Sequence, residues 1–430
     1  MSNTELARLP GFRDFPPEEL AVRSHVFDAW RRVSRRYGFQ EYDGPPLEPL
    51  GLYVEKSGEE IVGQLYAFTD KGGREVALRP EMTPSLARIL AERSRALPKP
   101  IRWFSIPQLF RYERQQRGRL REHFQWNVDV VGEAGEGADA EVLAVALDAL
   151  RALGLTAEDV RARVSDRRLL SALLSAAGVA PDRLLAAFAV IDKVEREARE
   201  RTRVRLREEA GLAEAQADAV LSLFDDPSLD AVRTRFGDDP EVADAVARLE
   251  AYLATLRAMG LGPFVAFDLS IVRGLAYYTG VVFEVFDRRG EFRAVCGGGR
   301  YDRLLERVGG EALPAVGFGM GDVVLTELLR ARGLLPDTAR SLDYFLVWVG
   351  AEARARALAL AHRLRDRGAA VGYALRETGV RRQFKNAESE GARAVIVLGP
   401  DELERGVARV RDMTSGQERE VPLAELEEGA

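Results

Sequence analysis

Polar and apolar side chains alternate along residues 124–131, directly after an arginine-rich segment. Gln125, Asn127 and Asp129 are each separated by one residue, so on a strand their side chains point to the same face. The segment from Arg111 to Arg121 carries several guanidinium groups around a glycine, and planar guanidinium groups suit phosphate oxygens. These residues fit a polar pocket beside a phosphate-binding loop. They fit equally an exposed hairpin with salt bridges in its loop.

Two strand-like runs flank the arginine-rich segment, at residues 104–110 and 124–131. Together they predict a long hairpin with a basic loop. A second hairpin is predicted within residues 65–79, where a Gly-Gly pair joins two alternating runs. This second hairpin leads to Glu81 and to Thr83, which could cap the apolar helix that follows.

Further elements are predicted along the chain. Residues 18–37 have helical spacing and stop at Gly38, because glycine often ends a helix. A strand that stops at Pro45 follows. Residues 136–153 predict an amphipathic helix, and residues 263–286 have the composition of strands.

Length and composition limit the classes of protein to consider. The chain has 430 residues, which is long enough for two or three domains. It contains no apolar run long enough to span a membrane, and its N-terminus lacks the apolar region of a signal peptide. One cysteine and three scattered histidines argue against a disulfide framework and against a metal site. A cytoplasmic protein is therefore predicted; the net charge of −6 gives no positive indication of RNA binding.

The segment FRYERQQRGRLREHFQWNVDVVG, residues 110–132, resembles motif 2 of class II aminoacyl-tRNA synthetases, specifically that of histidyl-tRNA synthetases. It departs from the family pattern at Gln115, where the family has proline, and in a shifted aromatic residue, Phe124 after His123. Residues 273–284 (RGLAYYTGVVFE) and 296–304 (CGGGRYDRL) resemble two motifs specific to that family. The helix and strand near the N-terminus resemble motif 1, which builds the dimer interface in this enzyme class.

The resemblance implies how ATP is bound. Arg111 and Arg273 would be the catalytic residues, holding the α-phosphate from opposite sides, since two guanidinium groups can stabilise the charge that grows there. Glu113 would lie near the adenine amine, and Arg119 is the prediction for a further phosphate contact. The resemblance also implies Mg²⁺ as a cofactor, with no metal site built by the protein alone.

The resemblance also implies a histidine site. Glu81, Thr83 and Gln125 would surround the α-amino group, because a buried ammonium needs acceptors. Asp129 and the Tyr278 hydroxyl would hold the two imidazole nitrogens. The full predicted set is Glu81, Thr83, Gln125, Asp129, Arg273, Tyr277 and Tyr278.

Two regions are expected to contact tRNA. The predicted contacts are Arg114, Gln116 and Arg117 in the motif 2 loop and Arg381, Arg382 and Lys385 in the C-terminal segment. That segment alternates strands with helices, which predicts an α/β sheet, and it resembles the anticodon-binding domain of the family. Residues 167–257 have helical periodicity and the position of the family's helical insertion.

An α+β protein is thus predicted, with a class II antiparallel-sheet catalytic domain (1–166 and 258–333), a helical insertion (167–257) and an α/β anticodon-binding domain (337–430). The implied function is histidine–tRNA ligase, acting as a homodimer without a membrane. One alternative is a non-catalytic, histidine-sensing regulatory subunit of ATP phosphoribosyltransferase, which generally lacks the C-terminal domain. Another is a module that binds tRNA without chemistry.

Two departures from the family pattern bear on activity. Ala276 stands where the family has aspartate, and Asp322-Val323 stand where motif 3 has Glu-Arg. The motif 3 arginine ordinarily packs on the adenine and contacts the γ-phosphate. An active enzyme is predicted in which another cation, Mg²⁺ or an arginine such as Arg119, takes that place.

Overall fold

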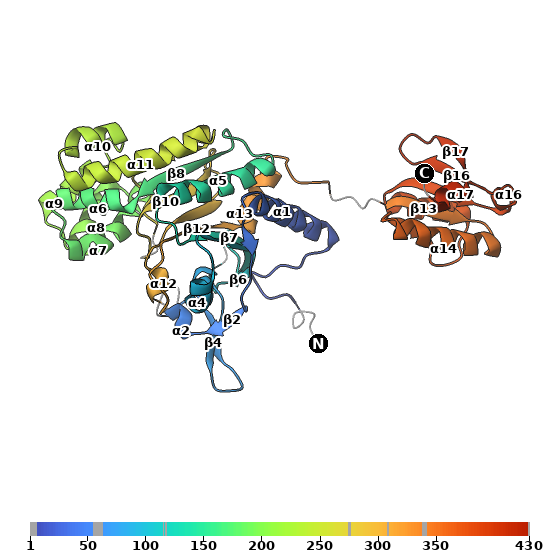
Figure 1. Cartoon of the computed structure of the whole chain (residues 1–430), viewed down its shortest axis with the longest axis horizontal. Helices are drawn as coiled ribbons and strands as arrows, with labels where there is room; N and C mark the ends of the chain where they lie inside the picture. Colours follow the sequence, from blue (N-terminus) through green and yellow to red (C-terminus); the bar gives the residue numbers. More distant parts are fainter. Residues whose placement is uncertain are drawn as a thin grey trace. The chain divides into compact units, whose positions relative to one another are not determined.

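The computed structural model describes residues 7–54, 63–114, 116, 118–273, 277–307, 309–337 and 342–428. The chain divides into two compact units, Met1–Pro336 and Asp337–Ala430 (Figure 1).

A mostly antiparallel sheet forms the centre of the first unit. Its strand order is β1–β5–β7–β12–β11–β10–β8–β9, with β6 paired to β7. The β1–β5 and β8–β9 pairs are parallel. This arrangement confirms the predicted antiparallel catalytic sheet. The strands are β1 Gln40–Glu41, β5 Ile101–Ser105, β6 Gln108–Phe110, β7 Glu122–Val131, β8 Val160–Asp166, β9 Val265–Phe267, β10 Val281–Asp287, β11 Cys296–Arg300 and β12 Ala315–Gly321.

Helices α1 (Pro17–Arg36), α5 (Glu136–Ala152) and α13 (Asp322–Ala331) cover one face of this sheet (Figure 1). The indole rings of Trp30 and Trp126 stack there at 5.8 Å, and Trp126 also meets Phe318 edge-on. Because side chains alternate along β7, Gln125, Asn127 and Asp129 project to the opposite face, as the sequence predicted. These three helices do not cover that opposite face, which carries the candidate binding residues.

A small antiparallel sheet lies beside the main one, in the order β2 (Leu47–Pro49), β4 (Glu75–Leu78), β3 (Tyr66–Thr69). The β3–β4 hairpin confirms the prediction from the Gly-Gly pair, and Gly73 adopts a φ of +79° in the turn. Two helices accompany this sheet, α2 Gly51–Val54 and α4 Thr83–Arg93.

Two predicted strands are interrupted. The run 104–110 forms β5 and β6 rather than one strand, with the break at Pro107, whose ring nitrogen cannot donate to a ladder. β6 still pairs with β7, so the long hairpin is confirmed. The stretch 263–286 forms β9 and β10, and Tyr277 and Tyr278 lie in the loop between them. Ala276 lies outside the described residues.

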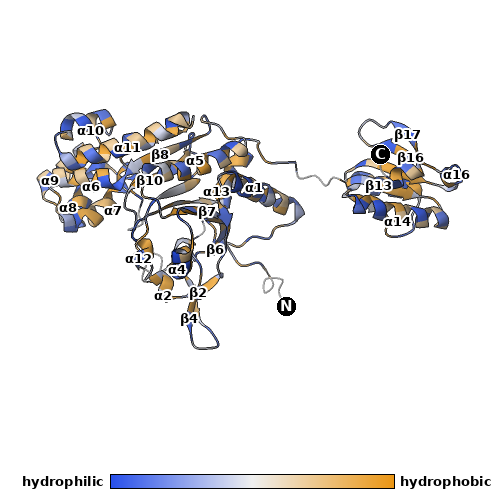
Figure 2. Cartoon of the chain, in the orientation of Figure 1, coloured by the Kyte–Doolittle hydropathy of each residue, from blue (hydrophilic) through white to orange (hydrophobic). Residues whose placement is uncertain are grey.

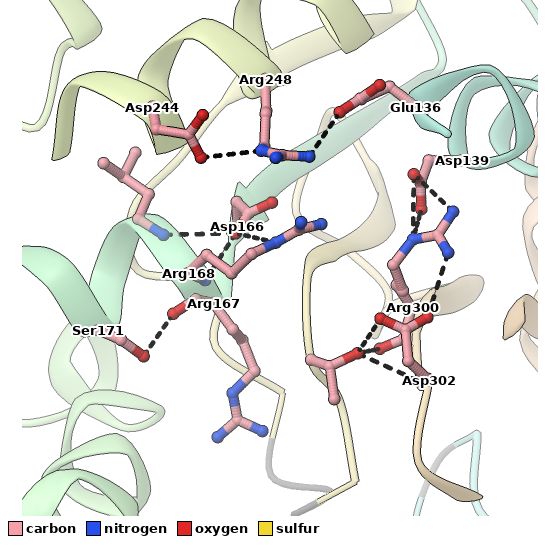
Figure 3. A network of polar contacts seen from close by, with 12 residues as sticks. Glu136, Asp139, Asp166, Arg167, Arg168, Ser171, Asp244, Arg248, Arg300 and Asp302 are labelled. Atoms are coloured by element: carbon pink, nitrogen blue, oxygen red, sulfur yellow. Dashed lines mark hydrogen bonds and ion pairs between the residues drawn. The ribbon is translucent and has the colours of Figure 1, made fainter. Parts of the chain in front are cut away.

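The stretch predicted as a helical insertion is helical. Its helices are α6 Arg167–Ala176, α7 Leu184–Ile191, α8 Arg199–Glu208, α9 Glu214–Ser222, α10 Leu229–Phe236 and α11 Pro240–Ala258, and they gather at the β8–β10 end of the sheet in Figure 1. Asp166 at the end of β8 caps α6, accepting from the amides of Arg168 and Leu169. Arg248 of α11 donates to Asp244 and to Glu136 of α5 (Figure 3), which ties the inserted helices to the central sheet.

The second unit is a mixed sheet in the order β14–β13–β15–β16–β17. β13 is parallel to β14 and β15, whereas the last two pairs are antiparallel, which confirms the predicted α/β unit. Figure 2 shows apolar residues on its central strands and many hydrophilic ones on α14. The elements are β13 Leu342–Trp348, α14 Ala351–Asp366, β14 Val371–Tyr373, α15 Val380–Ser389, β15 Ala392–Leu398, α16 Pro400–Glu404, β16 Val407–Asp412, β17 Glu418–Pro422 and α17 Leu423–Glu428.

Candidate active site

Glycines of β11 and β12 form the floor beneath the predicted site residues. A Cβ at Gly317 would lie 2.0 Å from an Asp129 carboxylate oxygen, and one at Gly319 would lie 2.7 Å from the Gln125 side chain. A Cβ at Gly297 would lie 1.4 Å from the Arg273 guanidinium. Since only glycine leaves this space, the glycine runs allow the side chains of the site to lie flat across the sheet.

Asp129 is buried at one end of this floor, 5% exposed. The hydroxyl of Tyr301 donates a hydrogen bond to it. Burial raises the pKa of Asp129 to about 7, and the bond from Tyr301 offsets part of that shift. The sequence analysis did not single out Tyr301, although it lies in the glycine-rich motif. The contact depends on strand register, which sets Gly299 of β11 opposite Gly317 of β12 and Gly317 opposite Asp129.

A group of tyrosines adjoins Asp129. The Tyr277 ring lies 5.0 Å from that of Tyr278 and 5.9 Å from that of Tyr301. The Thr83 side chain lies close enough to Tyr277 to offset part of the rise in pKa that burial causes there. Thr83 does not cap α4, whose N-cap is Met82. Glu81 is also buried. These residues, all predicted to bind the histidine substrate, therefore lie close to one another.

The side chains of the two predicted catalytic arginines are held by different interactions. Arg111 donates from Nε to the Pro80 carbonyl at 3.0 Å, which joins the hairpin to the segment before Glu81. Arg273 lies 3.3 Å from the Glu284 carboxylate, and its guanidinium sits 5.6 Å above the Tyr278 ring. Its φ of +55° is unusual for a residue with a side chain, as is common where a site holds backbone strain.

The loop after Arg111 carries the remaining predicted ATP and tRNA residues. Glu113 lies 4.0 Å from Arg111 and 3.2 Å from Arg119. Arg114 and Gln116 are exposed, as is Arg119. The predicted tRNA contact Arg117 and the departure at Gln115 lie outside the described residues.

His123 is a site-facing residue that the sequence analysis passed over. The shifted aromatic Phe124 points to the helices, where its ring lies 5.2 Å from Phe27. His123 therefore shares the face of Gln125. Burial first, and then the Arg111 charge, lower the pKa of His123 to about 3, so its imidazole is neutral. Strand alternation counted back from Gln125 would have found it.

Two protein-family models match this chain. The family model for histidyl-tRNA synthetase matches residues 11–322, and that for an anticodon binding domain matches residues 343–429. The chain belongs to the histidyl-tRNA synthetase family. The second match, to a domain that the regulatory relatives generally lack, does not favour the regulatory-subunit alternative.

Relatives of known activity agree with this membership, and a solved structure shares the fold. The histidine–tRNA ligase of Opitutus terrae is 44% identical over 421 residues, covering 97% of this chain and 96% of that protein. The chloroplastic/mitochondrial histidine–tRNA ligase of Arabidopsis thaliana is 40% identical and covers 97% of this chain and 85% of that protein. The crystal structure of histidyl-tRNA synthetase from Nostoc sp. PCC 7120 shares the fold, with a TM-score of 0.83 at 24% identity over 98% of each chain.

Arg300, in the family's glycine-rich motif, connects the elements that surround the site. It is 1% exposed and bonds to Asp139 of α5 through Nε at 3.0 Å and Nη2 at 2.9 Å. It also reaches Asp302, whose carboxylate accepts from the Thr279 hydroxyl at 2.9 Å (Figure 3). These bonds connect β11, α5 and the loop that carries the site tyrosines.

Asp322, which stands in place of a motif 3 residue of the family, connects several elements of the fold. Asp322 begins α13 and accepts hydrogen bonds from the Phe124 amide and from Arg13, both at 2.9 Å. Arg13 also donates to Glu122 at 2.6 Å, so Asp322 joins the N-terminal segment, β7 and α13. The α13 side chain facing the motif 2 loop is Val324, 3.2 Å from a Cβ built at Gly118.

The predicted RNA contacts of the second unit lie on α15. Arg381, Arg382 and Lys385 are exposed, whereas Gln383 is buried. The Gln383 amide accepts from the Trp348 amide nitrogen at 3.1 Å and donates to the Trp348 carbonyl at 2.9 Å. This glutamine of the motif therefore fixes α15 to β13 and leaves the basic residues facing outward.

Proposed function

We propose that this chain is a histidine–tRNA ligase that forms histidyl-adenylate from histidine and ATP. It then transfers the histidyl group to the 3′ end of tRNA(His), releasing AMP and pyrophosphate. One observation carries the proposal beyond family membership: a buried carboxylate among tyrosines, at Asp129, shares one glycine-lined face with the Arg273 guanidinium. A carboxylate suited to an imidazole and a cation suited to phosphate therefore share this face.

The histidine side chain would bind between Asp129 and Tyr278. A carboxylate accepts from one imidazole nitrogen and a hydroxyl bonds to the other, so an apolar side chain of similar size would leave both groups unpaired. Buried Glu81, with Thr83 and Gln125, would accept from the α-ammonium group. Tyr277, whose side chain lies close to that of Thr83, would position Thr83.

Arg111 and Arg273 would stabilise the reacting phosphate. The histidine carboxylate attacks the α-phosphorus, and pyrophosphate leaves with its charge increased. Fixed guanidinium groups stabilise this charge without reorganising, so positioning and electrostatics can carry the rate without a protein nucleophile. The stacked, ion-paired Arg273 is held in place for such a role.

ATP would bring Mg²⁺ with it. Among the described residues there is no cluster of three or more histidine, cysteine, aspartate or glutamate side chains that could hold a metal. Mg²⁺ usually binds through substrate phosphates and one or two carboxylates, and Glu113 is the carboxylate beside the phosphate-binding arginines. When bound, the ion would neutralise phosphate charge.

tRNA would contact the exposed loop residues Arg114 and Gln116, together with Arg117 of the same loop. It would also contact the α15 residues Arg381, Arg382 and Lys385. In the second unit, Val349, Leu375 and Val380 expose 43%, 82% and 37% of their surface where β13, β14 and α15 end or begin. Apolar surface beside cations suits unstacked bases of single-stranded RNA.

The proposal also includes a homodimer and a location in the cytoplasm. Among the described residues, no helix is long and apolar enough to cross a membrane.

Histidine-dependent exchange of pyrophosphate into ATP tests the function. The protein should catalyse exchange with histidine and with no other amino acid, and should then charge tRNA(His). Binding of histidine without exchange, at saturating Mg²⁺, would contradict the proposal and favour a sensor.

A further inference from the structure

A small hollow lies where the motif 2 loop meets α13. Its volume is about 400 Å³, and Gly118, Val324 and Arg293 are among its lining residues. Val324, one residue after the Asp322-Val323 pair that replaces the motif 3 Glu-Arg, lines this hollow with an apolar side chain. Arg293 enters the same hollow from a different element, the turn between β10 and β11.

Arg293 is fixed to the motif 2 loop. Its Nη2 donates to the Gln116 side-chain oxygen at 2.6 Å. The neighbouring residues of the loop are charged: Arg119 lies 3.2 Å and Arg111 4.0 Å from Glu113. The Glu113 charge also acts on Arg293, so three guanidinium groups interact electrostatically with this carboxylate.

Arg293 is repelled by a neighbouring guanidinium group. Burial first, and then repulsion from Arg119, lower the pKa of Arg293, while Glu113 acts in the opposite direction. Two carboxylates, Glu291 and Glu327, also line the hollow, and Glu291 is paired with Arg332 at 3.2 Å. Like charges held together are stabilised when an anion binds between them.

Arg293 and Arg273 are close enough along the chain to reach one polyphosphate. The Arg273 guanidinium lies over Gly297, which is four residues after Arg293 in the sequence. A strand advances about 3.3 Å per residue, so the two backbone positions are at most about 13 Å apart. Arginine side chains reaching inward from both ends can therefore contact one triphosphate.

We propose that Arg293 binds the β- and γ-phosphates of ATP and supplies, from the β10–β11 turn, the cation that α13 lacks. The inference rests on the proposed function and names a residue for its ATP site. Arg119 would share this role from the loop, while Arg111 and Arg273 hold the α-phosphate.

The test compares Arg293→Ala with Arg289→Ala, a matched control that removes an exposed arginine from the same turn. Equilibrium binding of ATP and of AMP is measured for each variant, because AMP lacks the β- and γ-phosphates. Arg293→Ala should weaken ATP binding about 10- to 100-fold, the range for hydrogen bonds to charged groups. AMP and histidine binding should stay within twofold, and Arg289→Ala should match the unmodified protein.

A second variant separates phosphate binding from a purely structural role. Val324→Arg, added to Arg293→Ala, places a guanidinium in the same hollow from α13 and should restore at least part of the ATP affinity. Unchanged ATP affinity in Arg293→Ala, or equal losses for ATP and AMP, would overturn the inference. Absence of exchange in the unmodified protein would instead count against the proposed function, and the binding comparison would still decide the role of Arg293.

Discussion

At the scale of single residues, Arg111 and Arg273 carry the proposed chemistry. Replacing either with alanine should lower the exchange rate by about 100-fold or more, because each removes a fixed donor to developing charge. The Tm should change little for Arg111→Ala, since its side chain is 31% exposed. Exchange rates within threefold of the unmodified protein for both variants would refute the assignment.

Asp129 combines a functional role with a cost in stability. Its pKa of about 7 in the fold exceeds that of an unfolded aspartate, about 3.9. The unfolded chain therefore loses this proton first, and the free energy of unfolding decreases as pH rises from about 4 to 7. Asp129→Asn removes this loss.

We expect Asp129→Asn to raise the free energy of unfolding at pH 8 by about 1–4 kcal/mol, with a smaller gain at pH 5. The same variant should raise KM for histidine, because the imidazole loses its carboxylate partner. Urea unfolding at the two pH values and exchange kinetics measure both effects. A variant that is destabilised equally at both pH values would show that Asp129 is not held near neutrality.

At the scale of elements, alternation and glycine runs could be predicted from the sequence. The face of β7 that carries Gln125 and Asp129 followed from local periodicity, and so did the β3–β4 hairpin. The role of Tyr301 could not be predicted in this way, because its hydroxyl reaches β7 from the end of β11, with β12 between them. The sequence predicted a strand for the loop before β10, because tyrosine and valine favour strands.

The Arg300–Asp139 pair is the main link between elements. Both side chains are 1% exposed, and burial raises the pKa of Asp139 to about 6 even though Arg300 acts in the opposite direction. Removing one partner leaves an uncompensated buried charge, so Arg300→Met should cost about 3–5 kcal/mol. The double variant Arg300→Met/Asp139→Leu should recover much of that loss, as measured by chemical unfolding; a double variant as unstable as the single one would contradict this.

At the scale of the whole molecule, each unit has its own core. The apolar clusters around Trp30 and Tyr301 belong to Met1–Pro336, whereas those around Trp348 and Phe345 belong to Asp337–Ala430. The sequence predicted the second unit from alternating strands and helices. The exact bounds of the inserted helices within the first unit remain a prediction, because α11 packs against both α5 and α6.

Because the cores are separate, removing residues 337–430 should leave the first unit folded and able to activate histidine. Pyrophosphate exchange should stay within about threefold, whereas kcat/KM for tRNA charging should fall at least tenfold, since the exposed cations of α15 are lost. The full chain with Arg381, Arg382 and Lys385 changed to alanine is the matched control: it should keep exchange, weaken tRNA binding and reduce the dependence of that binding on salt, because fewer phosphate contacts release fewer counterions. If the folded, truncated protein charged tRNA with unchanged kcat/KM, the second unit would have to serve some purpose other than RNA recognition.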